Sequence, residues 1–346
     1  MAFAQTVTGR VPAAALGATL MHEHVLCDLR PVDARDDGSL SPPITMENRF
    51  EVDYFQNRHP VNMWLDDDRA AARDLAALRD AGGGTLVELS IGGIEPQPER
   101  LAALSAQTGV AIVAGAGWYV DAFLDDGVRS MDEDAIAEAI AGQLRHGAWG
   151  TRVRAGIIGE IGCTWPLSPV ERRMLRAAAR VQRETGAAIT VHPGRHPDAP
   201  EEIAGILEAA GADPSRTVVG HMDRTIFDRD RLLALLRRGF VLEWDFFGIE
   251  TSQYWMAGED LDLPTDYQRL DLLADLMAAG FCEQLAISHD ICTRTRLLAW
   301  GGHGYRHILA HVVPLALRRG WSEEDVHQIL VATPARLLAY LPEGEA

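Results

Sequence analysis

The chain has 346 residues, of which 47% are hydrophobic, so it is long enough to bury a large core. Its formal net charge is −18, and it lacks a basic stripe of the kind that binds nucleic acid or an acidic membrane surface. No apolar run reaches the roughly 18 residues of a transmembrane helix. Four cysteines without C-x-x-C spacing are typical of reduced thiols in the cytoplasm. We therefore expect a cytoplasmic protein without nucleic-acid or membrane partners.

Eight short and almost continuously apolar runs are typical of strands buried on both faces. They cover residues 19–25, 85–91, 111–119, 156–162, 188–192, 217–222, 240–246 and 284–290. Amphipathic patterns between them predict helices over residues 67–81, 132–145, 168–185, 228–238 and 270–279. The alternation predicts a parallel sheet, and eight units favour a closed (β/α)₈ TIM barrel, with residues 1–346 as one domain. An open dinucleotide-binding sheet is disfavoured because no G-x-G-x-x-G follows the first strand.

Several histidines and acids lie at or near the ends of these apolar runs, where an unpaired polar side chain is costly. His22 and His24 are two apart on a strand, so both point to the same face. The C-terminal ends of barrel strands converge on one face, which is where barrel active sites lie. A metal site there would use His22, His24, Glu160, His192, His221 and Asp290. The alternatives are satisfied core histidines and an internal ion pair of Glu160 with an arginine.

Longer motifs resemble one known family. They are LGATLMHEH at 16–24, GIIGEIGCTW at 156–165, HPGR at 192–195, HMDRT at 221–225, SHD at 288–290, TRTRL at 293–297 and GGHGY at 301–305. Over nearly its whole length the chain is similar to the phosphotriesterase family of the amidohydrolase superfamily, and most to its phosphotriesterase-related branch.

The resemblance implies a binuclear metal hydrolase. It implies His22, His24 and Asp290 on one metal, His192 and His221 on the other, and Glu160 bridging the two. Zinc suits these ligands, although manganese, iron or cobalt would also fit. Two such metals can bind one hydroxide between them, and Asp290 is the expected proton shuttle. The chain contains no lysine, so the carboxylated lysine that bridges the metals of phosphotriesterases is impossible here.

The residues that would select the substrate are less clear. Arg195, Arg224 and Arg294 follow strands and could bind an anionic group, or could pair with nearby acids. Tyr119, Trp165 and Trp244 could wall the pocket, or could pack in the core. Glu243 and Asp245 could face the site together, and the irregular segment 30–62 is either an active-site loop or a plain insertion.

The resemblance to the phosphotriesterase-related branch implies hydrolysis of the amide bond in a small anionic N-acyl compound, such as N-acetyltaurine or an N-acyl amino acid. The alternative is a lactonase or phosphotriesterase, which an apolar pocket poor in arginine would favour. A second alternative is a metal-binding protein without catalytic activity. The resemblance also suggests a homodimer.

Overall fold

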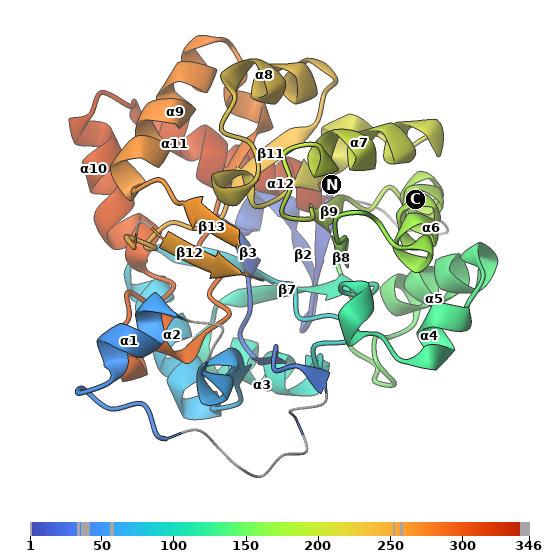
Figure 1. Cartoon of the computed structure of the whole chain (residues 1–346), viewed down its shortest axis with the longest axis horizontal. Coiled ribbons are helices and arrows are strands. Elements are labelled where there is room, and N and C mark those ends of the chain that lie inside the picture. Colours follow the sequence, from blue (N-terminus) through green and yellow to red (C-terminus); the bar gives the residue numbers. More distant parts are fainter. Residues whose placement is uncertain are drawn as a thin grey trace.

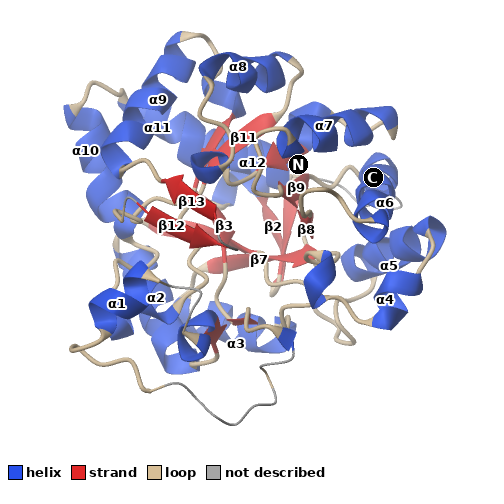
Figure 2. Ribbon diagram, viewed as in Figure 1, coloured by secondary structure: helices blue, strands red, loops and turns tan. Residues whose placement is uncertain are grey.

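A barrel of eight parallel strands forms the centre of the computed structural model, which describes residues 2–32, 35, 42–55, 59–251, 253–256 and 259–339. Helices surround this barrel (Figures 1 and 2). The strands in chain order are β3 (Ala18–Glu23), β6 (Gly83–Glu88), β7 (Ala111–Ala116), β8 (Ile157–Gly162), β9 (Ile189–His192), β10 (Thr217–Val219), β11 (Val241–Trp244) and β14 (Leu285–Ile287). Each overlaps a predicted apolar run, with β3 and β6 beginning one and two residues before theirs, so the predicted (β/α)₈ barrel is confirmed. Most of these strands end before their predicted run does, because the chain turns outward at the rim.

The barrel closes between its first and last strands by contacts other than a regular ladder. Each neighbouring pair from β3 through to β14 is hydrogen-bonded in parallel, whereas β14 and β3 stand at the two ends of that order. At this seam the backbone N–H of Asp290 donates to the carbonyl of His22 over 3.1 Å. The N–H of His22 donates to Ser288 Oγ over 3.0 Å. A side chain therefore replaces part of the missing ladder.

The outer layer consists of helices that follow the barrel strands. They are α1 (Arg49–Tyr54), α2 (Asp68–Asp80), α3 (Pro98–Thr108), α4 (Asp126–Ser130), α5 (Glu133–Arg145), α6 (Pro169–Thr185), α7 (Ala199–Ala209), α8 (Arg229–Arg237), α9 (Asp266–Ala278), α10 (Val313–Arg318), α11 (Glu323–His327) and α12 (Thr333–Leu338). Helix α9 begins four residues before its predicted start at 270, since Thr265 and Gln268 form a capping box. Two π-helical turns, Ile308–Val312 and Gln328–Ala332, directly precede α10 and α12.

Small and branched side chains from several strands fill the barrel interior toward the N-terminal ends of the strands. They include Val87, Val113, Val218 and Val241. A hairpin of β1 (Phe3–Thr6) and β2 (Gly9–Pro12) covers the N-terminal ends of the strands, where the N–H of Val7 donates to Ile112 O over 2.8 Å. The other two-stranded sheets are β4 (Cys27–Asp28) with β5 (Trp64–Leu65), and β12 (Gln253–Met256) with β13 (Glu259–Asp262). Among the described residues, no helix is long and apolar enough to cross a membrane.

Candidate metal centre

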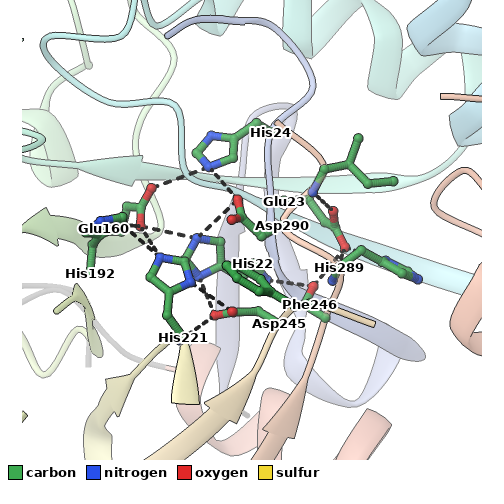
Figure 3. Close-up of polar contacts among 12 residues, drawn as sticks. His22, Glu23, His24, Glu160, His192, His221, Asp245, Phe246, His289 and Asp290 are labelled. Atoms are coloured by element: carbon green, nitrogen blue, oxygen red, sulfur yellow. Dashed lines mark hydrogen bonds and ion pairs between the residues drawn. The ribbon is translucent and has the colours of Figure 1, made fainter. Parts of the chain in front are cut away.

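The six predicted ligands meet at the C-terminal end of the barrel, with the carboxylate of Glu160 between them (Figure 3). Glu160 Oε1 lies 3.4 Å from His24 Nε2. Its Oε2 lies 3.2 Å from His22 Nε2, 3.0 Å from His192 Nδ1 and 3.5 Å from His221 Nε2. Asp290 Oδ1 lies 3.3 Å from His24 Nε2. All six side chains are buried, and Glu160 is the group that both halves of the cluster share.

Local backbone geometry brings these side chains together. Gly159 has φ +109°, and a Cβ there would meet the carbonyl of Thr190 at 2.1 Å, so only glycine lets β8 approach β9 beside Glu160. His221 and Asp290 adopt left-handed conformations, with φ of 57° and 49°. Such conformations cost on the order of 1–3 kcal/mol in residues with a Cβ and cluster at functional sites. The surrounding contacts must therefore hold both residues in place.

Asp245 holds His221 in its orientation. Its Oδ2 accepts the backbone N–H of His221 over 2.8 Å, and its Oδ1 lies 2.8 Å from His221 Nδ1. The proton of His221 therefore sits on Nδ1, which leaves the Nε2 lone pair facing Glu160. A carboxylate behind a metal-binding histidine is a common way to fix ring orientation and tautomer. Asp245 and Glu243 both face the ring of His22, at 3.3 and 3.6 Å from its Nδ1.

The donor set fits divalent metal ions. Two groups of three side chains have ligand atoms within 4.8 Å of one another, and they share one residue: His22, His24 and Glu160; Glu160, His192 and His221. Neither ring nitrogen of His22 makes a hydrogen bond within the described part of the chain. Imidazole nitrogens with carboxylate oxygens suit zinc and related transition metals. A third group of His22, His221 and Asp245 is less suitable, because Asp245 already binds His221 through both oxygens.

Electrostatics favour a cation at this centre. Burial disfavours a charged imidazole at His24, but Asp290 and Glu160 outweigh it and raise the pKa of His24 to about 10. The same contact acts in reverse on Asp290, whose pKa falls to about 2 although burial opposes the change. Without a metal, the centre holds protons on His22 and His24, whose rings face these carboxylates. A divalent cation would take their place.

A cavity of about 470 Å³ opens above these ligands. Of the six predicted substrate residues, Tyr119, Trp165, Arg195 and Arg224 line it. Arg224 Nη2 lies 3.2 Å from His192 Nε2, and the Tyr119 ring packs against the His192 ring with centroids 5.0 Å apart. Trp165 stacks on His196, also in the lining, with centroids 4.5 Å apart.

The structure does not bring Trp244 and Arg294 to the cavity. Trp244 is 1% exposed and packs in the core cluster between barrel and helices. Alternation along β11 explains this, since Glu243 and Asp245 face inward and Trp244 must face outward. The guanidinium of Arg294 lies over the rings of Trp64 and Trp300, with its Nε donating to Trp64 O.

Two tyrosines are among the lining residues that were not predicted. Tyr254 lies on the hairpin of β12 and β13, and Tyr54 ends α1 within the predicted loop 30–62. Nothing in the sequence marks β12 and β13 as strands, because β13 is acidic rather than apolar. Residues 33, 34, 36–41 and 56–58 of the predicted loop lie outside the described residues.

The model of the phosphotriesterase family matches residues 2–338. The chain belongs to the phosphotriesterase family. This metal-dependent hydrolase is 41% identical to the N-acetyltaurine hydrolase of Tetraodon nigroviridis over 345 residues, which covers 97% of each chain.

Solved structures show the same fold. A resiniferatoxin-binding protein from Rhodobacter sphaeroides superposes with a TM-score of 0.91 at 30% identity, covering 97% of this chain and 95% of that one. A mutant of a PTE-like lactonase from Deinococcus radiodurans superposes with a TM-score of 0.77 at 32% identity, covering 97% and 99%. The solved structures share the fold of this chain, and the family match and the hydrolase relatives give its hydrolase chemistry. The names of these relatives differ in the compound that each protein binds or hydrolyses.

Proposed function

We propose that this protein binds two divalent cations, of which zinc suits the ligands best, and hydrolyses the amide bond of a small anionic N-acyl compound. One cation would be held by His22, His24 and Asp290, and the other by His192 and His221. Glu160 would contact both. The geometry supports the shared role of Glu160, because its Oε1 faces His24 whereas its Oε2 faces His192 and His221 as well as His22.

Bound at these ligands, the cations would activate a water molecule and polarise the scissile carbonyl. Asp290 is suited to move the proton. It lines the cavity, and its carboxylate can accept a proton from the attacking water. It can then pass that proton to the leaving nitrogen. The His24 contact fixes its carboxylate at the cavity floor.

The observation that carries the substrate class is a pair of arginines in the cavity wall. Arg195 and Arg224 both line it, and Arg195 Nε has no hydrogen-bond partner within the described residues. Guanidinium groups bind sulfonate, carboxylate or phosphate groups through paired N–H donors. A cavity for a neutral lactone has no use for two such charges. The similarity to N-acetyltaurine hydrolases supports the same class of anionic N-acyl substrates, because the substrate in their name is an acyl amide that also carries a sulfonate group.

The second candidate is a lactonase or phosphotriesterase. The likeness to the PTE-like lactonase favours it, as do the apolar side chains of Leu29, Phe123 and Phe246 in the cavity wall. A third possibility, metal binding without catalysis, is disfavoured because Asp290 and the paired arginines share one cavity with the cluster.

Metal content per chain, measured together with turnover of N-acetyltaurine, an N-acetyl amino acid, a lactone and a phosphotriester, tests the proposal. We expect two metals per chain and cleavage of the anionic amides. Two metals with turnover of only the lactone or phosphotriester would select the second candidate. Absence of metal after reconstitution, with no turnover, would refute the hydrolase mechanism.

A further inference from the structure

Glu23 is a buried carboxylate that lies between two metal ligands in sequence but faces away from the metal centre (Figure 3). Its Oε1 accepts hydrogen bonds from Ser288 Oγ over 2.8 Å, from the backbone N–H of His289 over 2.9 Å and from His289 Nδ1 over 2.6 Å. Its Oε2 accepts the backbone N–H of Ile291 over 3.0 Å. Four donors from one short segment thus converge on a single side chain.

This segment carries Asp290. The residues before and after Asp290 each give a backbone N–H to Glu23, one to each carboxylate oxygen. Asp290 itself has the left-handed φ of 49°, which a residue with a Cβ rarely adopts. A carboxylate that binds both flanking N–H groups favours this turn over extended alternatives. Glu23 therefore holds the backbone around Asp290 in place, as Asp245 holds the backbone and ring of His221.

The hydrogen-bond partners of His289 define where its ring proton lies. Ile308 donates its backbone N–H to His289 Nε2 over 3.1 Å, so the ring proton of His289 is on Nδ1 and points at Glu23. A buried carboxylate that accepts four hydrogen bonds has its acceptors satisfied. Because β3 and β14 share no ladder, this contact also joins the end of β3, between His22 and His24, to the segment after β14 that carries Asp290.

We propose that Glu23 is a positioning residue that sets the place of Asp290 relative to His22 and His24, and thereby assembles one of the two metal sites. This inference rests on the two-cation centre proposed above. His192 ends β9 and His221 comes two residues after β10, and neither strand borders the seam between β3 and β14. The second site should therefore depend on Glu23 much less than the first.

The test is a zinc titration of the Glu23→Gln variant in chelator-buffered zinc. The amide keeps one acceptor oxygen but turns an NH₂ group toward existing donors. The hydrogen bonds accepted by one of the two carboxylate oxygens are therefore lost. We expect one of the two zinc affinities to fall by about 10- to 100-fold, as is usual when a partner behind a metal ligand is lost. The other affinity should stay within about twofold of the wild type.

Glu171→Gln is the matched control. Glu171 is also fully buried and accepts four hydrogen bonds, from Asp121 N, Thr164 N, Thr164 Oγ1 and Ser168 N. It caps α6, and among the described residues its hydrogen bonds go to Asp121, Thr164 and Ser168 rather than to any of the six ligands. This variant should lower the unfolding temperature while both zinc affinities remain at the wild-type values.

A second pair of variants keeps the test decisive if Glu23→Gln does not fold. His289→Asn places an amide N–H near the position of Nδ1, whereas His289→Ala removes that donor. Alanine should selectively weaken one zinc site, and asparagine should restore it. Equal affinities in wild type and variants, or an equal loss at both sites, would overturn the inference. A wild-type chain that takes up no metal would instead overturn the proposed function, and this inference with it.

Discussion

The Nδ1 atom of His192 and the Nε2 atom of His221 face each other across 2.7 Å, and both lie beside the same oxygen of Glu160. Two imidazole nitrogens this close repel each other if both present lone pairs, so they require a shared proton or a cation between them. Asp245 already fixes the proton of His221 on Nδ1. The pair is thus arranged to receive a cation, and Glu160 Oε2 lies within 3.5 Å of both facing nitrogens.

Replacement of Glu160 by glutamine should weaken both metals together. A neutral amide removes the shared charge from both halves of the cluster, and loss of a direct ligand should exceed the about 10- to 100-fold cost of losing an outer partner. Competition with a zinc chelator measures both affinities, with Glu171→Gln as control. Weakening of only one metal would show that Glu160 does not serve both.

Reconstitution of the metal-free protein should not depend on bicarbonate. The chain has no lysine to carboxylate, and Glu160 already supplies a carboxylate in the centre of the cluster. Zinc uptake and recovered activity in buffer free of carbon dioxide should equal those with added bicarbonate. A requirement for bicarbonate would contradict the role of Glu160.

Metal binding should release protons. The pKa of His24 in the metal-free centre is raised from its ordinary value of 6.5 to about 10, so at pH 7 to 9 this imidazole is still charged and a cation must displace its proton. Apparent zinc affinity should therefore rise with pH, by up to about tenfold per pH unit for each proton released. Calorimetry in two buffers with different ionisation enthalpies counts these protons. Binding without proton release would mean that His24 is neutral in the metal-free protein.

The sequence was sufficient to predict the barrel and to place the six cluster residues on its C-terminal rim. Both conclusions follow from apolar runs that end in polar residues, since parallel strands bring those ends together. The same parity that brings His22 and His24 to one face excludes Trp244, once Glu243 and Asp245 are known to face inward. The sequence alone could not show which side chains of β11 face the barrel interior, because glutamate, tryptophan and aspartate each occur on either face of a strand.

The missed parts depend on contacts distant in sequence. Tyr254 reaches the cavity on a hairpin whose strands lack apolar alternation. Arg294 lies outside the cavity because its guanidinium packs on the rings of Trp64 and Trp300. Glu23 points to the opposite face of β3 from His22 and His24, but no sequence pattern shows what it binds. Its four donors come from residues more than 260 positions later, so no local pattern could reveal them.

Arg195→Met should weaken turnover of anionic N-acyl substrates. Loss of a hydrogen bond to a charged group costs about 1.5–3 kcal/mol, which corresponds to about 10- to 150-fold in kcat/KM, mainly through KM. Turnover of a neutral lactone, if any, should change little. Arg238→Met is the control, because Arg238 pairs with Glu208 at the surface. An unchanged KM for N-acetyltaurine would remove Arg195 from the proposed site.

Asp74→Asn should change how stability depends on pH. Asp74 is buried on α2 and accepts the N–H of Leu298 over 3.1 Å, yet burial dominates and raises its pKa to about 7. A carboxyl whose pKa is higher in the folded state than its unfolded value of about 3.9 binds more protons when folded. It therefore costs the native state stability as the pH rises from about 4 to 7. The free energy of unfolding of wild type minus that of Asp74→Asn, in saturating metal, should fall between pH 5 and 7 by up to about 1.4 kcal/mol per pH unit. Asp80→Asn removes an exposed charge from the same helix and serves as control. A difference that is flat between pH 5 and 7 would show that Asp74 is ionised throughout, with the Leu298 contact outweighing burial.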